Sequence, residues 1–192
     1  MTESETPATN PPAKPAGLGV WCLPLILGTF WCVADQLTKF WVVQTMELGE
    51  AIVLWEGFFA LHHVRNEGAA FSLLSGARWL LVSLAFVALA ALWFFRAHLG
   101  LERRLYRIAI GLILGGILGN LIDRILLGYV VDFLDFVIPV IDYPWPTFNV
   151  ADIGIVCGVF LYISLNLVLP AGPSTAGKST PADAAPPPTS TG

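Results

Sequence analysis

The stretch LYRIAIGLILGGILGNLI, residues 105–122, is apolar over most of its length but repeats glycine at four-residue spacing, at Gly111, Gly115 and Gly119. A helix that crosses the hydrocarbon core of a bilayer needs about 17–25 predominantly apolar residues. Glycines at this spacing form a smooth strip that lets a second helix approach closely in lipid. We therefore expect a transmembrane helix that packs tightly against a neighbour.

Three further apolar runs have similar length, and they are Leu18–Ala34, Trp79–Phe95 and Ile153–Leu169. Hydrophobic residues make up 56% of the 192-residue chain and charged residues only 12%, against about 25% in soluble proteins. The mean hydropathy is +0.71. So few charges do not cover a water-soluble surface, and we expect an all-α membrane protein with four transmembrane helices in one domain, residues 18–170.

The fourth run carries Gly154 and Gly158, again at four-residue spacing. Two such strips favour close packing of the third and fourth helices. This packing would hold the outer ends of the two helices together.

Basic residues indicate the orientation of the chain. The link between the second and third runs holds Arg96, Arg103, Arg104 and Arg107, with Glu102 as its only acid. Links rich in Lys and Arg stay in the cytoplasm. Four spans then place both termini in the cytoplasm and the other two links outside.

The two ends of the chain, residues 1–17 and 171–192, are rich in Pro, Ala, Ser and Thr. Such segments bury little apolar surface, so we expect disordered cytoplasmic tails. The first tail has no basic region of the kind that opens a cleavable signal peptide. The three cysteines lie inside apolar runs and show no metal-ligand spacing. We expect no metal, no cofactor and no nucleic-acid partner.

The first outward link contains two aromatic and β-branched runs, Ile52–Trp55 and Phe58–Val64. Such runs favour short strands. The segment NEGAAFSLLSG follows, with Gly68 at an expected turn and Ala70 behind it. We expect a small extracytoplasmic β-sheet that lies on the outer membrane surface and closes over a groove.

Polar residues interrupt the apolar runs at two places. Asp35 and Lys39 are four residues apart at the end of the first run, so they share a helical face. Asn120, Asp123 and Arg124 share a face at the outer end of the third run. Polar groups near lipid are costly and usually functional. A solvated helix end and a purely structural Asp123–Arg124 network are the alternatives.

Four acids gather in the stretch VVDFLDFVIPVIDYPWPTFNVADIG, residues 130–154, and they are Asp132, Asp135, Asp142 and Asp152. Two close carboxylates do not both ionise cheaply, so one keeps a proton. The ionised partner can take a proton from water while the protonated one polarises a carbonyl. The spacing leaves open whether Asp132 and Asp152 meet. Asp152 also suits a helix cap behind Asn149, and Asp132 also reads as a loop acid without a role.

Five motifs occur in order and closely resemble the lipoprotein signal peptidases, also called signal peptidase II. They are DQLTK (35–39), NEGAAFS (66–72), GNLIDR (119–124), VVDF (130–133) and FNVAD (148–152). The resemblance covers residues 18–170. It implies an intramembrane aspartic endopeptidase of the bacterial cytoplasmic membrane. Such an enzyme removes signal peptides from diacylglyceryl-modified prolipoproteins by cutting just before the lipidated cysteine.

The resemblance also implies roles for individual residues. Asp132 and Asp152 match the catalytic dyad, and Asn66 and Arg124 match positions that contact the substrate or the inhibitor globomycin. The other matching positions form supporting polar or loop elements, and they are Asn120, Asn149, Asp35, Lys39, Asp123, Gly68 and Ala70. One departure is Ile153-Gly154, where many relatives have Ser-Ala.

The implied partners are diacylglyceryl prolipoproteins, membrane lipid and globomycin-type inhibitors, and we expect a monomer. Two other function classes compete with this reading. A small transporter predicts ionisable groups at the bilayer midplane and inverted repeats. A non-catalytic membrane scaffold predicts that replacing either acid has no effect.

Overall fold

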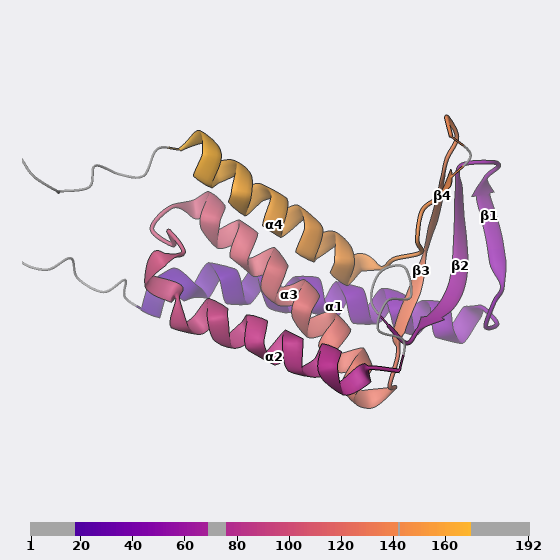
Figure 1. The fold of residues 1–192 in the computed structure, drawn as a ribbon, viewed down its shortest axis with the longest axis horizontal. Helices are drawn as coiled ribbons and strands as arrows, with labels where there is room; N and C mark the ends of the chain where they lie inside the picture. The colour runs from indigo at the N-terminus through magenta and orange to yellow at the C-terminus, as the bar shows by residue number, and fades with distance from the viewer. Residues whose placement is uncertain (1–17, 69–75, 142, 170–192) are drawn as a thin grey trace, which may run out of the picture.

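A computed structural model of the protein describes residues 18–68, 76–141 and 143–169. Its four α-helices run alongside one another (Figure 1) and are α1 Cys22–Thr45, α2 Arg78–Phe94, α3 Arg104–Leu126 and α4 Val150–Val168. By length and composition α1, α3 and α4 are able to cross a membrane, and α2 is a shorter apolar helix of 17 residues. Two short 3-10 helices, η1 Leu18–Trp21 and η3 Arg96–His98, lie before α1 and after α2.

A four-stranded antiparallel sheet stands at one end of the helices, opposite the end where α1 begins and α4 ends (Figure 1). Its order is β1 Ala51–Trp55, β2 Phe59–Asn66, β3 Val130–Ile138 and β4 Tyr143–Pro144. The two strands expected in the first outward link are confirmed as β1 and β2. Strand β3 follows α3 directly and pairs with β2, so that Val64 lies opposite Asp132 and Asn66 lies opposite Val130.

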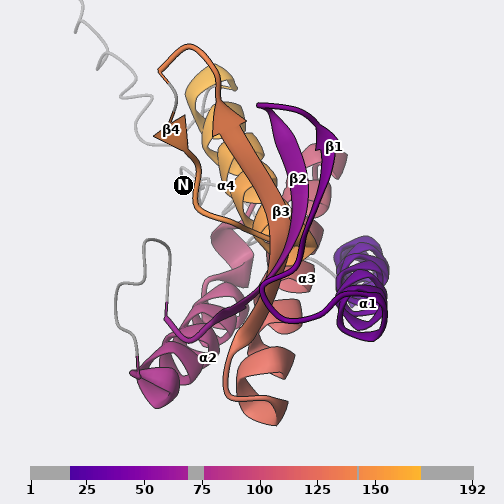
Figure 2. The ribbon, with the colours of Figure 1, turned by 90° about the vertical axis from the view of Figure 1, so that its right-hand side faces the viewer.

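Helix α3 lies between α1 and α4 and packs closely against both (Figure 2). The expected contact between α3 and α4 is confirmed at Gly158, where an added Cβ would lie 2.7 Å from the Ala109 carbonyl. On α3, Gly116 faces α4 in the same way, because a Cβ added there would meet Ala151 and Ile155.

The glycine strip of α3 faces a different neighbour from the one we expected. A Cβ added at Gly115 would lie 2.6 Å from the Gly28 carbonyl of α1, and Gly111 meets Pro24 and Leu27 of the same helix. The expectation that this strip packs against α4 is therefore wrong for its first two members. A four-residue spacing defines one helix face, but it does not say which neighbour covers that face.

Helix α1 continues well beyond the apolar run that predicted it. Asp35 and Lys39 lie within the helix, and their side chains are 0% and 3% exposed. The reading of these residues as a solvated helix end is therefore wrong. Their charges are paired inside the protein, so the helix continues through them to Thr45.

The outward surfaces of the helices are apolar. Large side chains such as Phe30, Val87 and Phe160 are each more than 60% exposed. Soluble monomers rarely expose apolar surface on this scale. The helices are therefore built for contact with lipid.

Candidate active site

Asp132 lies on β3 and is only 2% exposed. Its Oδ1 accepts a hydrogen bond of 2.6 Å from the Asn149 amide, and its Oδ2 accepts one of 2.8 Å from the Asn66 amide. The pairing of β3 with β2 places Asn66 here. Asp132 is thus a buried acid within a strand of the sheet, and the expectation that it lies in a loop is wrong.

Asp152 lies in the first turn of α4. Its backbone N–H donates to Asn149 Oδ1 at 3.0 Å, and its Oδ2 accepts from the Asn149 backbone N–H at 3.2 Å. This reciprocal pair is a capping box, so the capping role of Asp152 is confirmed. Its other oxygen, Oδ1, accepts from Asn120 Nδ2 of α3 at 2.7 Å. Asp152 therefore has a tertiary partner that capping does not require.

Two amides bridge the two acids. Asn149 Nδ2 donates to Asn120 Oδ1 at 3.1 Å as well as to Asp132, while Asn120 donates to Asp152. The fold thus brings Asp132 and Asp152 into one cluster, although 20 positions separate them in the sequence.

The pKa of Asp132 is raised to about 7, chiefly by burial and then by the negative charge of Asp152. Hydrogen bonds from Asn66 and Asn149 oppose this rise because they favour the ionised form. A raised pKa next to a second carboxylate is what general acid–base chemistry near neutral pH requires.

The remaining two acids of the stretch differ in position. Asp135 is three residues from Asp132 on the same strand, so it points to the opposite face of the sheet. It is partly exposed and lies 3.5 Å from His62 Nδ1. Asp142 lies outside the described residues.

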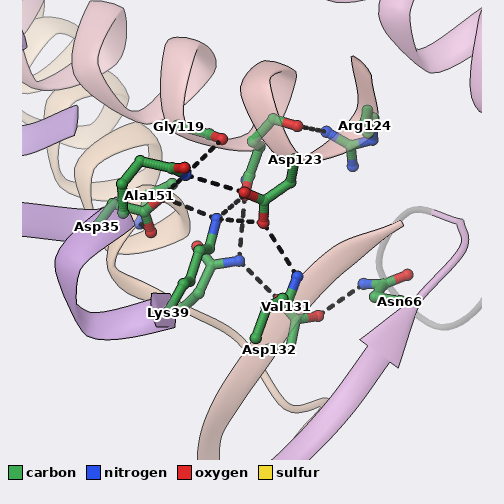
Figure 3. A network of polar contacts seen from close by, with 12 residues as sticks. Asp35, Lys39, Asn66, Gly119, Asp123, Arg124, Val131, Asp132 and Ala151 are labelled. Atoms are coloured by element: carbon green, nitrogen blue, oxygen red, sulfur yellow. Dashed lines mark hydrogen bonds and ion pairs between the residues drawn. The ribbon is translucent and has the colours of Figure 1, made fainter. Parts of the chain in front are cut away.

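A buried ion cluster lies beside the amide bridge (Figure 3). Lys39 Nζ is 2.8 Å from Asp35 Oδ2 and 3.0 Å from Asp123 Oδ2. Asp35 Oδ1 also accepts from the Ala151 N–H at 2.8 Å, and Asp123 Oδ2 accepts from the Val131 N–H at 3.1 Å. Each of these carboxylates therefore holds the backbone immediately before one of the two acids, Asp152 or Asp132.

Gln36 belongs to the same cluster, although our reading of the sequence missed it. Its Nε2 donates to Asp123 Oδ1 at 2.9 Å and to the Gly119 carbonyl at 3.2 Å. A second polar residue directly after Asp35, just past the end of the apolar run, was the available signal. Trp31 was also missed, and its Nε1 donates to the Val150 carbonyl at the start of α4.

Arg124 is half-buried and makes two long hydrogen bonds of 3.4 Å, to the carbonyls of Asn120 and Gly68. Gly68 in turn donates its N–H to Asn66 Oδ1 at 3.0 Å. Across the described ranges no ion pair joins Arg124 to Asp123. The position of Ala70 lies outside the described residues.

Within the part of the chain that the structure describes, no group of three or more His, Cys, Asp or Glu side chains is arranged to hold a metal ion. Cys22, Cys32 and Cys157 are free thiols.

Comparison with known proteins places this arrangement in a family. The sequence model of the family described as signal peptidase (SPase) II matches residues 27–168. The chain belongs to the signal peptidase II family. The match covers all the residues of the cluster, and the resemblance seen in the five sequence motifs is confirmed.

Individual relatives agree with the family assignment. The lipoprotein signal peptidase of Ralstonia nicotianae is 45% identical over 152 residues, which cover 77% of this chain and 83% of the relative. That of Symbiobacterium thermophilum is 44% identical over 147 residues, covering 77% and 95%. A solved structure described as a bacterial membrane enzyme superposes with a TM-score of 0.69 at 35% identity, covering 75% of this chain and 87% of that one. The chain is thus a membrane peptidase, and the small-transporter alternative is ruled out.

Proposed function

We propose that this signal peptidase II uses Asp132 and Asp152 as an aspartic dyad to remove signal peptides from diacylglyceryl-modified prolipoproteins. The cut falls just before the lipidated cysteine. The single observation that carries the proposal is the meeting of two carboxylates, one from β3 and one from α4, across the Asn120 and Asn149 amides. The substrate class follows from the relatives, which are named lipoprotein signal peptidases. Cleavage of a purified diacylglyceryl precursor by the detergent-solubilised chain tests this reaction.

The dyad works with one proton between two carboxylates. Asp132, with its raised pKa, holds the proton and donates it to the carbonyl oxygen of the scissile bond. Asp152 remains ionised and takes a proton from the attacking water, whose oxygen bonds to the carbonyl carbon. The tetrahedral intermediate then collapses: one of its hydroxyl groups returns a proton to Asp132, the C–N bond breaks, and the proton on Asp152 passes to the leaving amine. The two groups titrate as a pair, so the proton count belongs to the dyad.

Arg124 and Asn66 are placed to bind the substrate next to the dyad. The guanidinium is always charged and presents a rigid fork of donors that suits peptide carbonyls. Arg124 extends from α3 to the Gly68 carbonyl, and the Gly68 N–H donates to Asn66, so the guanidinium lies close to Asn66. We assign to Arg124 and Asn66 the binding of both the substrate backbone and globomycin-type inhibitors. One chain supplies the whole cluster, so a monomer is sufficient.

We further propose that all four helices cross the bacterial inner membrane. Helix α2 has 17 residues and rises about 25 Å, which is near the hydrocarbon thickness. The arginine-rich link 96–107 lies at the end of the bundle opposite the sheet. The positive-inside rule then puts this link and both tails, 1–17 and 171–192, in the cytoplasm. The peptidase domain is residues 18–170, and the dyad faces the extracytoplasmic side, where an exported precursor presents its cleavage site.

The orientation is testable with Glu56→Cys and Glu102→Cys, because both positions are exposed. A thiol reagent that does not cross membranes should label Glu56→Cys in intact cells and should label Glu102→Cys only after the cells are permeabilised. The unsubstituted chain, with its three native cysteines, provides the background. Labelling of Glu102→Cys in intact cells would contradict the orientation.

Cleavage should decline as the pH rises through about 7, because Asp132, whose pKa is raised to about 7, then loses the proton that it must donate. Below this value the dyad keeps one proton, whereas well above it both carboxylates are ionised. Each further pH unit should lower the active fraction by about tenfold. Initial rates at precursor concentrations well below KM measure this profile for the free enzyme, to which the Asp132 pKa applies. Asp135→Asn should show the same profile. A rate that stays constant from about pH 6 to about pH 9 would contradict the assignment of the proton.

A further inference from the structure

Lys39 is buried in α1, and its ammonium has three donors. Two of them face the carboxylates of Asp35 and Asp123 (Figure 3), and a third contact joins Nζ to Asn120 Oδ1 at 3.0 Å. The two ion pairs neutralise charge, as a structural cluster requires. The third contact leads directly to the amide that meets Asp152.

An ammonium group donates hydrogen bonds but accepts none. It therefore fixes which end of the Asn120 amide faces it: the oxygen must point at Lys39, and the NH₂ group must point at Asp152. Asn149 is fixed in a similar way by its helix cap, because its Oδ1 accepts the Asp152 N–H and its NH₂ group is left to face Asp132. Both carboxylates thus receive N–H donors from amides of defined orientation.

Asn149 Nδ2 also donates to the Asn120 oxygen, at 3.1 Å. Without the ammonium, this neutral donor alone would hold the Asn120 oxygen among the described residues, so the amide would keep this orientation less firmly. A half-turn would bring its oxygen against Asp152 Oδ1, where two acceptors meet unless the carboxylate is protonated. A protonated Asp152 is unable to take a proton from water. The Lys39–Asn120 contact therefore bears on the ionised form of Asp152 as well as on the stability of the fold.

We propose that Lys39 is a positioning residue that locks the orientation of the Asn120 amide and through it keeps an N–H donor on Asp152, the carboxylate that accepts a proton from water. This inference rests on the proposed dyad mechanism. It assigns to Lys39 a catalytic consequence separate from its pairing with Asp35 and Asp123.

Two variants separate the ion-pairing role of Lys39 from its positioning role: Lys39→Met alone, and a double variant that keeps the wild-type charge. Asp35, Lys39 and Asp123 together carry a net charge of −1, and the double variant Asp35→Asn/Lys39→Met also leaves −1, on Asp123. Asn at position 35 still offers an oxygen to the Ala151 N–H. Lys39→Met alone leaves two unpaired buried carboxylates and should unfold at a lower temperature. The double variant should recover most of that loss.

Catalysis should not recover with stability. In the double variant kcat should stay at least about tenfold below wild type, while KM changes little because Lys39 does not touch the substrate. Recovery of both the melting temperature and kcat would show that Lys39 acts only through its ion pairs, and the proposal would be overturned.

Asn120→Asp is a second variant that keeps the ammonium and tests the same link. Its carboxylate still accepts from Lys39, but it has no N–H to donate to Asp152. We expect a similar loss of kcat in folded protein, and wild-type kcat would overturn the inference even if the double variant failed to fold. Failure of the dyad itself is distinguishable, because it would appear as activity in Asp132→Asn with Lys39 intact.

Discussion

Asp132→Asn and Asp152→Asn should each lower cleavage by at least about 10²-fold, because an asparagine side chain neither accepts a proton from water nor donates one to the substrate as an acid does. The amide has nearly the shape of the carboxylate, so the fold and the binding of lipidated precursor should be retained. Asp132 accepts hydrogen bonds from two amides, so folding must be checked by thermal melting. Cleavage is then measured by gel shift on equal amounts of folded protein.

The double variant Asp132→Asn/Asp152→Asn should be scarcely worse than either single variant, because residues that act as one unit have non-additive effects. Asp135→Asn is the matched control: it changes the same residue type on the same strand, on the face away from the dyad. It should keep substantial activity. Near-normal turnover by either dyad variant would end the assignment and would favour the non-catalytic scaffold.

Gly116→Leu should produce the second large effect, on both stability and cleavage. A Cβ at this position would run into the Ala151 carbonyl and the Ile155 side chain at the start of α4. The Ala151 carbonyl belongs to the backbone and does not move aside as a flexible side chain does, so α4 must move away from α3. Overpacking of this kind costs about 1–3 kcal/mol, which corresponds to roughly 2–12 °C in melting temperature for a domain of this size.

The same displacement should lower cleavage by more than tenfold, because a misplacement of about 1 Å costs on the order of 10²-fold in catalysis. Asp152 moves with α4, whereas Asp132 stays with β3. Gly19→Leu is the matched control, since a Cβ there has no neighbour within 4 Å among the described residues. Wild-type melting and turnover in Gly116→Leu would mean that this contact does not position the dyad.

Local features of the fold were predictable from the sequence. The capping box at Asn149 and Asp152 is a short-range pattern, and so are the aromatic and β-branched runs that indicated β1 and β2. Four apolar runs located the helices. The start of α4 was placed three residues late because the cap itself precedes the apolar run.

Features that depend on tertiary pairing were not predictable. The first apolar run ends at Ala34 because hydropathy penalises Asp35 and Lys39, yet their pairing inside the protein lets α1 continue. The meeting of Asp132 and Asp152 depends on the pairing of β3 with β2 and on the packing of α4 against α3. Sequence spacing reveals neither the strand pairing nor the helix packing. The dyad was therefore predicted from the family resemblance. Gln36 was missed because its three partners come from α1 and α3 together.

The central claim is that this chain cleaves lipid-modified precursors with a pair of carboxylates. Its most direct test incubates the purified, detergent-solubilised protein with a diacylglyceryl prolipoprotein and, separately, with the same precursor lacking the lipid. Mass spectrometry identifies the products, and Asp132→Asn serves as the inactive reference. We predict that the lipidated precursor is cut to a product that begins with the lipidated cysteine, while the unlipidated precursor stays intact. A lipidated precursor that remains uncut by folded wild-type protein, or is cut equally well by Asp132→Asn, would contradict the claim.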